Sequence, residues 1–448
     1  MMPRPVPRLL SIVSIVLVPW LGVACTGELK DGTGAGGQSG SAGPAGSSGA
    51  GGGRGAAGQS GTGGTNGTAG STGSGGSTGA AGTTGRGGTT GAGGSSGTGG
   101  GIGSAGNPNG SCTAGVPARG QPADTSSPTT VVGTGTVASC TFGALQAAVT
   151  KGGVITFNCG AGAMTISVTA TLNVPVNKNT VIDGGNKITL DGGKAVQILS
   201  FNSPNFRATD FGLTVQHIAL TNGKRTPTQA IPTAPAPCSQ GWDDGEGGAI
   251  YVRDGALTVI DAIFTSNQAA PLGPDTGGGA IYILGSKAGA MIVNSTFSGN
   301  SASNAGAVGG LFSELDIYNS LFTNNTALGH DANNNEPSKC SVINNGQNET
   351  GSGGNGAAIY SDGNSVNVTL CGDAILNNAA GVNAFGGGLF FTSNDMGGTL
   401  SIADTTMTGN TGGHWTNVSS GGVTNAGTAV GTNAKSITIQ SSTIQGYP

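Results

Sequence analysis

The stretch GWDDGEGG, residues 241–248, gathers side chains that could do chemistry. The carboxylates of Asp243, Asp244 and Glu246 follow Trp242 within four positions. Sugar C–H faces stack on indole rings and carboxylates accept hydrogen bonds from hydroxyls, so this combination suits a carbohydrate. Three close carboxylates also suit calcium, which prefers oxygen ligands. The same residues would fit an ordinary solvated loop, so the sequence leaves three interpretations open: sugar binding, a calcium site and a plain surface loop.

A second group of similar character lies further along the chain. Residues 330–331 are His and Asp, and residues 414–415 are His and Trp. Both groups fall in segments that interrupt a repeat, where loops that share one face usually form a binding surface. The predicted ligand-binding residues are therefore Trp242, Asp243, Asp244, Glu246, His330, Asp331, His414 and Trp415.

An enzymatic interpretation of the same residues is weaker. Glycoside hydrolysis needs two carboxylates placed across the scissile bond, and the side chains of the adjacent Asp243 and Asp244 diverge. A lyase would need a cationic base beside bound calcium, and Arg225 and Arg253 are the nearest candidates. No catalytic motif surrounds them, so the sequence favours a non-enzymatic role. If the protein is an enzyme, the candidate catalytic residues are Asp243, Asp244 and Glu246, and calcium is the one metal or cofactor that the residues suggest.

The interrupted repeat is an eleven-residue phrase. Its first and third positions are apolar around a polar second position, which predicts a strand with one buried face. Its fifth position is small or polar and predicts a turn. Its eighth position is apolar again, and its last position is Asn in five copies. Asn tolerates a left-handed corner, and stacked Asn amides can hydrogen-bond to one another. The copies are LTVQHIALTNG from Leu213, LTVIDAIFTSN from Leu257, AMIVNSTFSGN from Ala290, LDIYNSLFTNN from Leu315, VTLCGDAILNN from Val368, LSIADTTMTGN from Leu400 and ITIQSSTIQGY from Ile437.

A glycine corner precedes most copies and predicts a third strand, as in GGAIYV from Gly247 and GGAIYI from Gly278. Three short strands per repeat predict an all-β, right-handed parallel β-helix with coils about 4.8 Å apart. The extra residues fall between the last position of one copy and the next glycine corner, so the insertions should leave one edge of the solenoid. The strand after the corner also carries aromatic residues, predicted to form an outward stripe that stabilises the solenoid by stacking, with ligand contact as the alternative: Tyr251, Tyr282, Tyr360 and Phe391.

A short helix is predicted before the first coil. In TFGALQAAVTKGG, Thr141 can cap the N-terminus, while Leu145, Ala148 and Val149 share one face. This helix would cover the end of the solenoid and prevent edge-to-edge association. Cys140 and Cys159 flank the segment and are predicted to pair, whereas the pairing of Cys112, Cys238, Cys340 and Cys371 stays open.

The first hundred residues differ from the rest of the chain in amino-acid composition. Residues 1–24 carry two arginines before a short apolar run, as in an export signal. Cys25 resembles the lipidated cysteine of a bacterial lipoprotein, with plain secretion as the alternative. Residues 25–110 are a Gly/Ser-rich linker with no apolar pattern to offset the entropy of ordering, so disorder is predicted. The β-helix domain should occupy residues 111–448. A net charge of -4 with no basic patch argues against nucleic acid.

The GGAI motifs at 247 and 278, with the FTSN, FSGN and FTNN phrases, resemble polymorphic outer membrane protein repeats of the pectin-lyase-like β-helix superfamily. This resemblance covers about residues 140–448. It implies a cell-surface structural or adhesive module that binds glycan or another surface through the loops at one corner. The superfamily also implies polysaccharide lyases and glycoside hydrolases, and a passive surface spacer is a third interpretation. The expected partner is a polysaccharide or cell-surface ligand, with membrane attachment only through a lipid at Cys25, on the bacterial outer membrane or cell surface.

Overall fold

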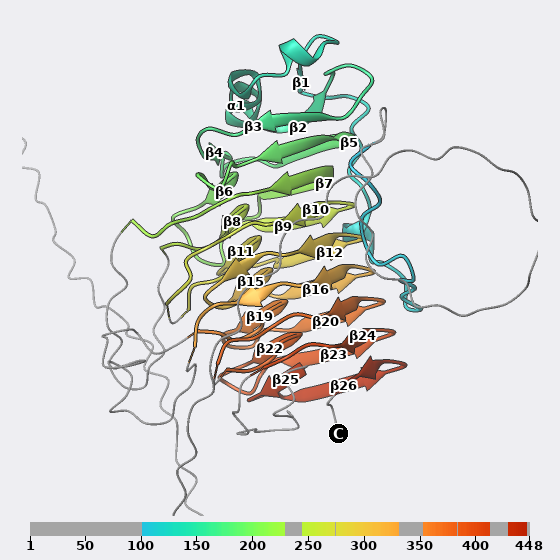
Figure 1. The fold of residues 1–448 in the computed structure, drawn as a ribbon, viewed down its shortest axis with the longest axis vertical. Helices are drawn as coiled ribbons and strands as arrows, with labels where there is room; N and C mark the ends of the chain where they lie inside the picture. The colour runs from blue at the N-terminus through green and yellow to red at the C-terminus, as the bar shows by residue number, and fades with distance from the viewer. Residues whose placement is uncertain are drawn as a thin grey trace, which may run out of the picture. The chain divides into compact units, whose positions relative to one another are not determined.

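The computed structural model describes residues 101–228, 244–273, 275–330, 353–382, 384–412 and 429–445. These residues form a stack of coils in which each strand pairs with the equivalent strand of the next coil (Figure 1). All strand pairings within these ranges are parallel, which confirms the predicted all-β solenoid. The export signal, Cys25 and most of the Gly/Ser-rich linker lie outside the described residues. None of the described helices is both long and apolar enough to cross a membrane.

One coil shows the arrangement of all the central ones. It consists of β8 (Ile250–Arg253), β9 (Ala256–Ile260) and β10 (Ile263–Thr265), which confirms three strands per repeat. Asp261, at the fifth position of the phrase, has a φ of 48° and turns the chain from β9 into β10. The fifth-position residues of the other copies have the same left-handed backbone: His217, Asn294, Asn319, Gly372, Asp404 and Ser441.

The strands of successive coils stack in columns. The column of β8 also contains β4 (Leu172–Asn173), β6 (Leu199–Asn202), β11 (Ile281–Leu284), β15 (Val308–Leu311), β19 (Ile359–Asp362), β22 (Leu389–Thr392) and β25 (Ala429–Thr432). The column of β9 contains β1 (Thr130–Val132), β2 (Gly153–Phe157), β5 (Thr180–Asp191), β7 (Gly212–Thr221), β12 (Ala290–Val293), β16 (Leu315–Tyr318), β20 (Val368–Cys371), β23 (Thr399–Ala403) and β26 (Ser436–Gln440). The column of β10 contains β3 (Met164–Ser167), the second halves of β5 and β7, β13 (Thr296–Ser298), β17 (Leu321–Thr323), β21 (Ala374–Leu376), β24 (Thr406–Thr408) and β27 (Thr443–Ile444).

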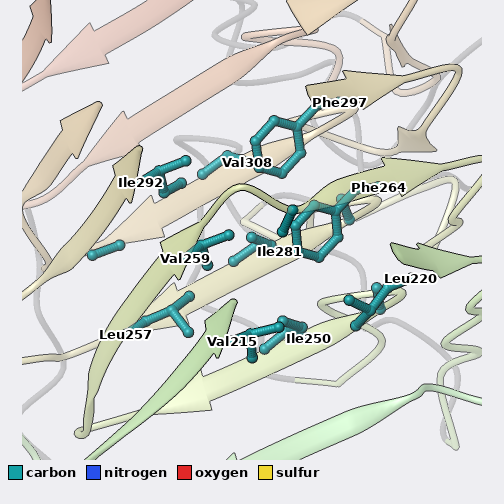
Figure 2. Packing of buried hydrophobic residues seen from close by; sticks show 14 of the residues in the cluster. Val215, Leu220, Ile250, Leu257, Val259, Phe264, Ile281, Ile292, Phe297 and Val308 are labelled. Carbon is teal, nitrogen blue, oxygen red and sulfur yellow. The ribbon is translucent and has the colours of Figure 1, made fainter. Parts of the chain in front are cut away.

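The interior is made of columns of like residues. Phe264, Phe297 and Phe322 are fully buried, and their rings stack with centroid separations of 4.8 and 4.7 Å. Figure 2 shows the first two rings one above the other, beside the aliphatic side chains of neighbouring columns. The ring spacing equals the distance between adjacent strands, so the stacking follows directly from the parallel register.

An asparagine ladder lies at the end of each phrase. The Asn267 side chain donates to Asn300 Oδ1 at 3.0 Å, and the same contact repeats between each later pair of coils, which confirms the predicted stack of amides. The left-handed residue, however, is the one before the ladder, as at Ser266 and Asn324. The prediction that these Asn residues themselves adopt the left-handed backbone was therefore wrong. The ladder side chains are Asn267, Asn300, Asn325, Asn378 and Asn410.

The helix α1 (Phe142–Lys151) covers the N-terminal coils as predicted. The Thr141 hydroxyl accepts a hydrogen bond from Ala144 N at 3.2 Å, and the predicted apolar face is buried. Two short 3₁₀ turns, η1 (Ala118–Gly120) and η2 (Val137–Ser139), precede it. A disulfide joins Cys140 to Cys159, the pair predicted from the sequence.

Residues 101–129 form a feature that the sequence did not predict. This segment, called the strap below, lies along the solenoid and is held by a disulfide between Cys112 and Cys371 (Figure 1). Residues 101–110 therefore contact the β-helix, although the sequence assigned them to the linker. They lie in the same compact unit as the coils, a unit that begins at residue 96.

The outward aromatic stripe is corrected at one position. Tyr251, Tyr282 and Tyr360 do point away from the core, but all three are buried. The fourth member is Phe390, which pairs with Tyr360 in register and stacks on it at 5.2 Å. Phe391 faces the interior and joins the main core. The stripe therefore stabilises the solenoid and is not an exposed ligand platform.

Candidate functional site at the loop corner

All the described ends of the insertions meet at one corner, called the loop corner below. The residues that follow the asparagine ladder pair in parallel from coil to coil, so every insertion starts from the same edge, as predicted. The pairs run from Lys224 to Gln268, Ser301, Thr326, Ala379 and Thr411, and they include the short strands β14 (Ser301–Ala302) and β18 (Thr326–Ala327).

A second set of amides lies under the ends of three insertions. Asn304 Oδ1 accepts from Asn355 N at 3.0 Å, and Asn355 Oδ1 accepts from Phe385 N at 2.9 Å. Both asparagines are buried. Each of these loops is therefore fixed at its exit by one ladder and at its return by another, so that the segment between them can vary in length without disturbing the coils.

Two of the three predicted acidic residues, Asp244 and Glu246, lie within the described residues. Asp244 Oδ1 accepts from Arg225 at 2.9 Å, and its other oxygen accepts from the Thr228 hydroxyl at 2.9 Å. Glu246 is buried, and its charge adds to the effect of burial in raising the pKa of the Tyr282 phenol. Trp242 and Asp243 lie outside the described residues. In the described part of the chain, the side chains placed to share a metal ion are Cys112, Cys371 and Asp404, and the two cysteines are consumed by a disulfide.

The second predicted group lies only partly within the described residues. His330 is half-buried three residues after the end of β18, whereas Asp331, His414 and Trp415 lie outside those residues. Cys238 and Cys340 are outside them as well. Near His330, the loop corner exposes apolar side chains: Leu328 is 47% exposed and Val382 is 68% exposed.

Sequence reasoning missed a pair of carboxyl groups beside the buried tyrosines. Asp362 accepts from the Tyr360 hydroxyl and from the Asn394 amide, each at 2.9 Å. Burial and, secondarily, the nearby charge of Asp362 together raise the pKa of Asp275 to about 7. Burial also raises the pKa of Asp362. Asp275 lies in the insertion before β11 and Asp362 ends β19, so they are far apart in sequence, and no shared motif marked them.

Comparisons with protein-family models, with curated proteins and with solved structures give no match. The likeness to polymorphic outer membrane protein repeats stays a prediction from the motifs. Function has to be inferred from the geometry.

Proposed function

We propose that this protein is an exported, surface-held β-helical module that binds glycan through the loop corner. The observation that supports this proposal most is the segregation of the insertions. They all leave from one edge of the solenoid, where two sets of buried amides fix their ends. Binding residues are commonly carried on loops that a rigid scaffold positions.

The chemistry of the insertions favours a carbohydrate ligand. The tryptophans at 242 and 415 lie in the insertions with several carboxylates. Leu328 and Val382, which are exposed at the described ends of other insertions, add apolar surface at the loop corner. Apolar faces flanked by hydrogen-bonding groups are complementary to sugar rings, which present C–H faces and hydroxyl edges. Lipidation of Cys25 would hold the module on the bacterial outer membrane, and the Gly/Ser-rich linker would give it reach.

The test is retention of the purified chain on a panel of immobilised neutral and acidic polysaccharides. We expect retention, and we expect the double substitution Trp242→Ala with Trp415→Ala to abolish it while leaving β-sheet circular dichroism intact. Phe206→Ala is the matched control, because Phe206 is 51% exposed on a different corner, between β6 and β7. Loss of retention in the control alone would place the binding surface elsewhere and contradict the proposal.

A polysaccharide-cleaving activity is a second candidate, supported by the carboxyl pair of Asp275 and Asp362. A carboxyl group with a pKa of about 7 is protonated in neutral solution often enough to act as a general acid. New reducing or unsaturated ends in the polysaccharide panel, lost in Asp275→Asn, would favour the enzyme. Retention without new ends favours the binding module. If the chain is neither retained nor cleaves the polysaccharide, a passive spacer is favoured.

A further inference from the structure

The strap runs the length of several coils and then returns. Its descending arm, residues 101–113, lies along the turns formed by the fifth-position residues, and it hydrogen-bonds to one coil after another. The contacts are Ile102 N to Asn186 O at 2.9 Å, Gly106 N to Thr296 Oγ1 at 2.9 Å, Asn107 N to Asn319 O at 2.8 Å, Cys112 N to Asn319 Oδ1 at 3.0 Å and Thr113 Oγ1 to Asp404 Oδ2 at 2.7 Å.

The returning arm, residues 114–129, climbs back over the same coils to β1. Arg119 donates to Leu257 O at 3.1 Å and to Gly289 O at 2.7 Å. Further up, Ala123 N donates to Gln216 Oε1 at 2.9 Å. The strap is thus a hairpin laid lengthwise on the solenoid, with its tip near Asp404.

The strap also has an apolar underside. Cys112 and Val116 pack against a small cluster separate from the main core, and the members of this cluster belong to four coils: Ile260, Met291, Val293, Tyr318 and Cys371. Most of these residues hold the fourth position of the phrase, which faces outward. They are buried because the strap covers them. The strap is therefore packed against the coils as well as hydrogen-bonded to them.

The disulfide near the tip of the strap determines which strand bears a force applied to the chain before the strap. Cys112 is bonded to Cys371, which is 259 residues away in sequence and ends β20. β20 pairs with β16 on one side and with β23 on the other, so it is an internal strand of its sheet. β1, where the returning arm ends, is three residues long and pairs with β2 alone among the described strands.

We propose that the strap is a mechanical anchor, which carries tension from the chain before residue 101 through Cys112 and Cys371 into β20, an internal strand near the C-terminal end of the solenoid. This inference rests on the N-terminal attachment in the proposed function but not on glycan binding. A pull along the descending arm loads its hydrogen bonds together, in shear, and ends at an internal strand. Without the disulfide, the same pull would pass through the returning arm and peel β1 from β2 one hydrogen bond at a time. Hydrogen bonds that are loaded together withstand a larger force than hydrogen bonds that break one after another. Resistance to forced unfolding is set by the unfolding rate.

The experiment stretches single molecules of the full chain between an N-terminal tag and a biotin-acceptor peptide inserted after Val382. With the disulfide intact, the loaded path contains only the arms 101–112 and 371–382. Apart from the N-terminal linker, extension should stop at roughly 80 Å until the molecule ruptures at high force. The double variant Cys112→Ser with Cys371→Ser should instead lengthen in steps at low force, by up to roughly 900 Å in total.

The matched control is Cys140→Ser with Cys159→Ser, which removes the disulfide beside α1 and should leave the response unchanged. Adding a reductant to folded wild-type molecules already under tension repeats the test without requiring any variant to fold. Lengthening of the untreated wild-type chain by more than roughly 80 Å at low force would overturn the proposal. Glycan retention is measured without tension, so failure of the anchor and failure of the proposed function give separate results.

Discussion

The two corners that flank the β10 column differ in how much their length varies from coil to coil. At the corner between the β9 and β10 columns, called the turn corner, consecutive coils from Leu257 onward cross with a single left-handed residue and no insertion. At the loop corner, on the other side of the asparagine ladder, the segments differ in length from coil to coil. The two corners differ because the number of residues in a segment can change only where no side chain within that segment hydrogen-bonds to an adjacent coil.

The turn corner has a bridging ladder of its own, formed by the sixth-position residues. Each of these side chains accepts a hydrogen bond from the backbone N–H of the equivalent residue one coil earlier. Ser295 and Ser320 also donate to the backbone carbonyl two residues before them. The inter-coil bonds run from Ala262 N to Ser295, Ser295 N to Ser320, Ser320 N to Asp373, Asp373 N to Thr405 and Thr405 N to Ser442. An insertion here would break bonds to both neighbouring coils, so coil length is fixed at this corner.

The largest effect is expected from placing the same insertion at each corner. Two glycines between Asn319 and Ser320 would remove at least two buried inter-coil hydrogen bonds, at about 1–3 kcal/mol each. Two glycines after Val382 only lengthen a loop, at a cost of about 0.5 kcal/mol. Thermal or urea unfolding measures the difference. Equal destabilisation by the two insertions would mean that the corners are not distinct.

A smaller but still large effect is expected at the asparagine ladder. Asn325 Oδ1 accepts from both the backbone and the side chain of Asn300. Asn325→Ala would strand these buried donors and should cost roughly 2–4 kcal/mol. Its exposed neighbour Asn324 has a φ of 56°, which glycine adopts freely, so Asn324→Gly should be nearly neutral. Comparable losses in urea unfolding of the two variants would argue against the ladder as the fixed base of the loops.

The third prediction concerns Asp373, the one carboxyl group in the sixth-position ladder. Burial raises its pKa to about 8, although it accepts from Ser320 N and Cys371 N. Between the unfolded pKa of about 3.9 and pH 8, the unfolded chain binds fewer protons than the folded one, so stability falls as pH rises.

Asp373→Ser, which installs the residue found in the two preceding coils, should therefore gain stability over wild type with rising pH, by up to about 1.4 kcal/mol per pH unit. Urea unfolding of both proteins at several pH values between 5 and 8 measures this difference. A difference that does not change with pH would show that Asp373 is ionised in the folded protein.

The smallest effect on stability is expected at the loop corner itself. The ion pair of Arg225 with Asp244 is partly exposed, so Arg225→Ala should cost at most about 1 kcal/mol. If the loop corner binds glycan, this variant should change retention more than it changes the unfolding midpoint. The reverse outcome would assign the pair a structural role only.

The repeat made the core and the ladder predictable from sequence. Phe264, Phe297 and Phe322 share the eighth position, and stacked coils leave them no place except one interior column. Thr141 likewise marked the start of α1, because a hydroxyl before an apolar periodic segment is a strong capping signal.

The features that were missed depend on contacts outside the repeat. Residues 101–129 have no apolar periodicity, since the strap binds mainly through its backbone to turns that are far away in sequence. The burial of Tyr282 could not be predicted because nothing in its own strand indicates what covers it. Phe391 was assigned to the wrong face because GGLFFT has two adjacent phenylalanines, and only the register shows that Phe390 matches Tyr360. The shared edge from which the insertions start was predictable from the repeat, because the extra residues always follow the asparagine position.

The strap also has a consequence for how this chain can evolve. Repeat proteins usually grow or shrink by duplication or deletion of whole repeats, since each new coil satisfies its neighbours. Here a span of fixed length is pinned near Asn186 at one end and bonded to Cys371 at the other. One more coil inside that span would leave the strap too short for Cys112 to reach Cys371. The length of the strap therefore limits the number of coils beneath it.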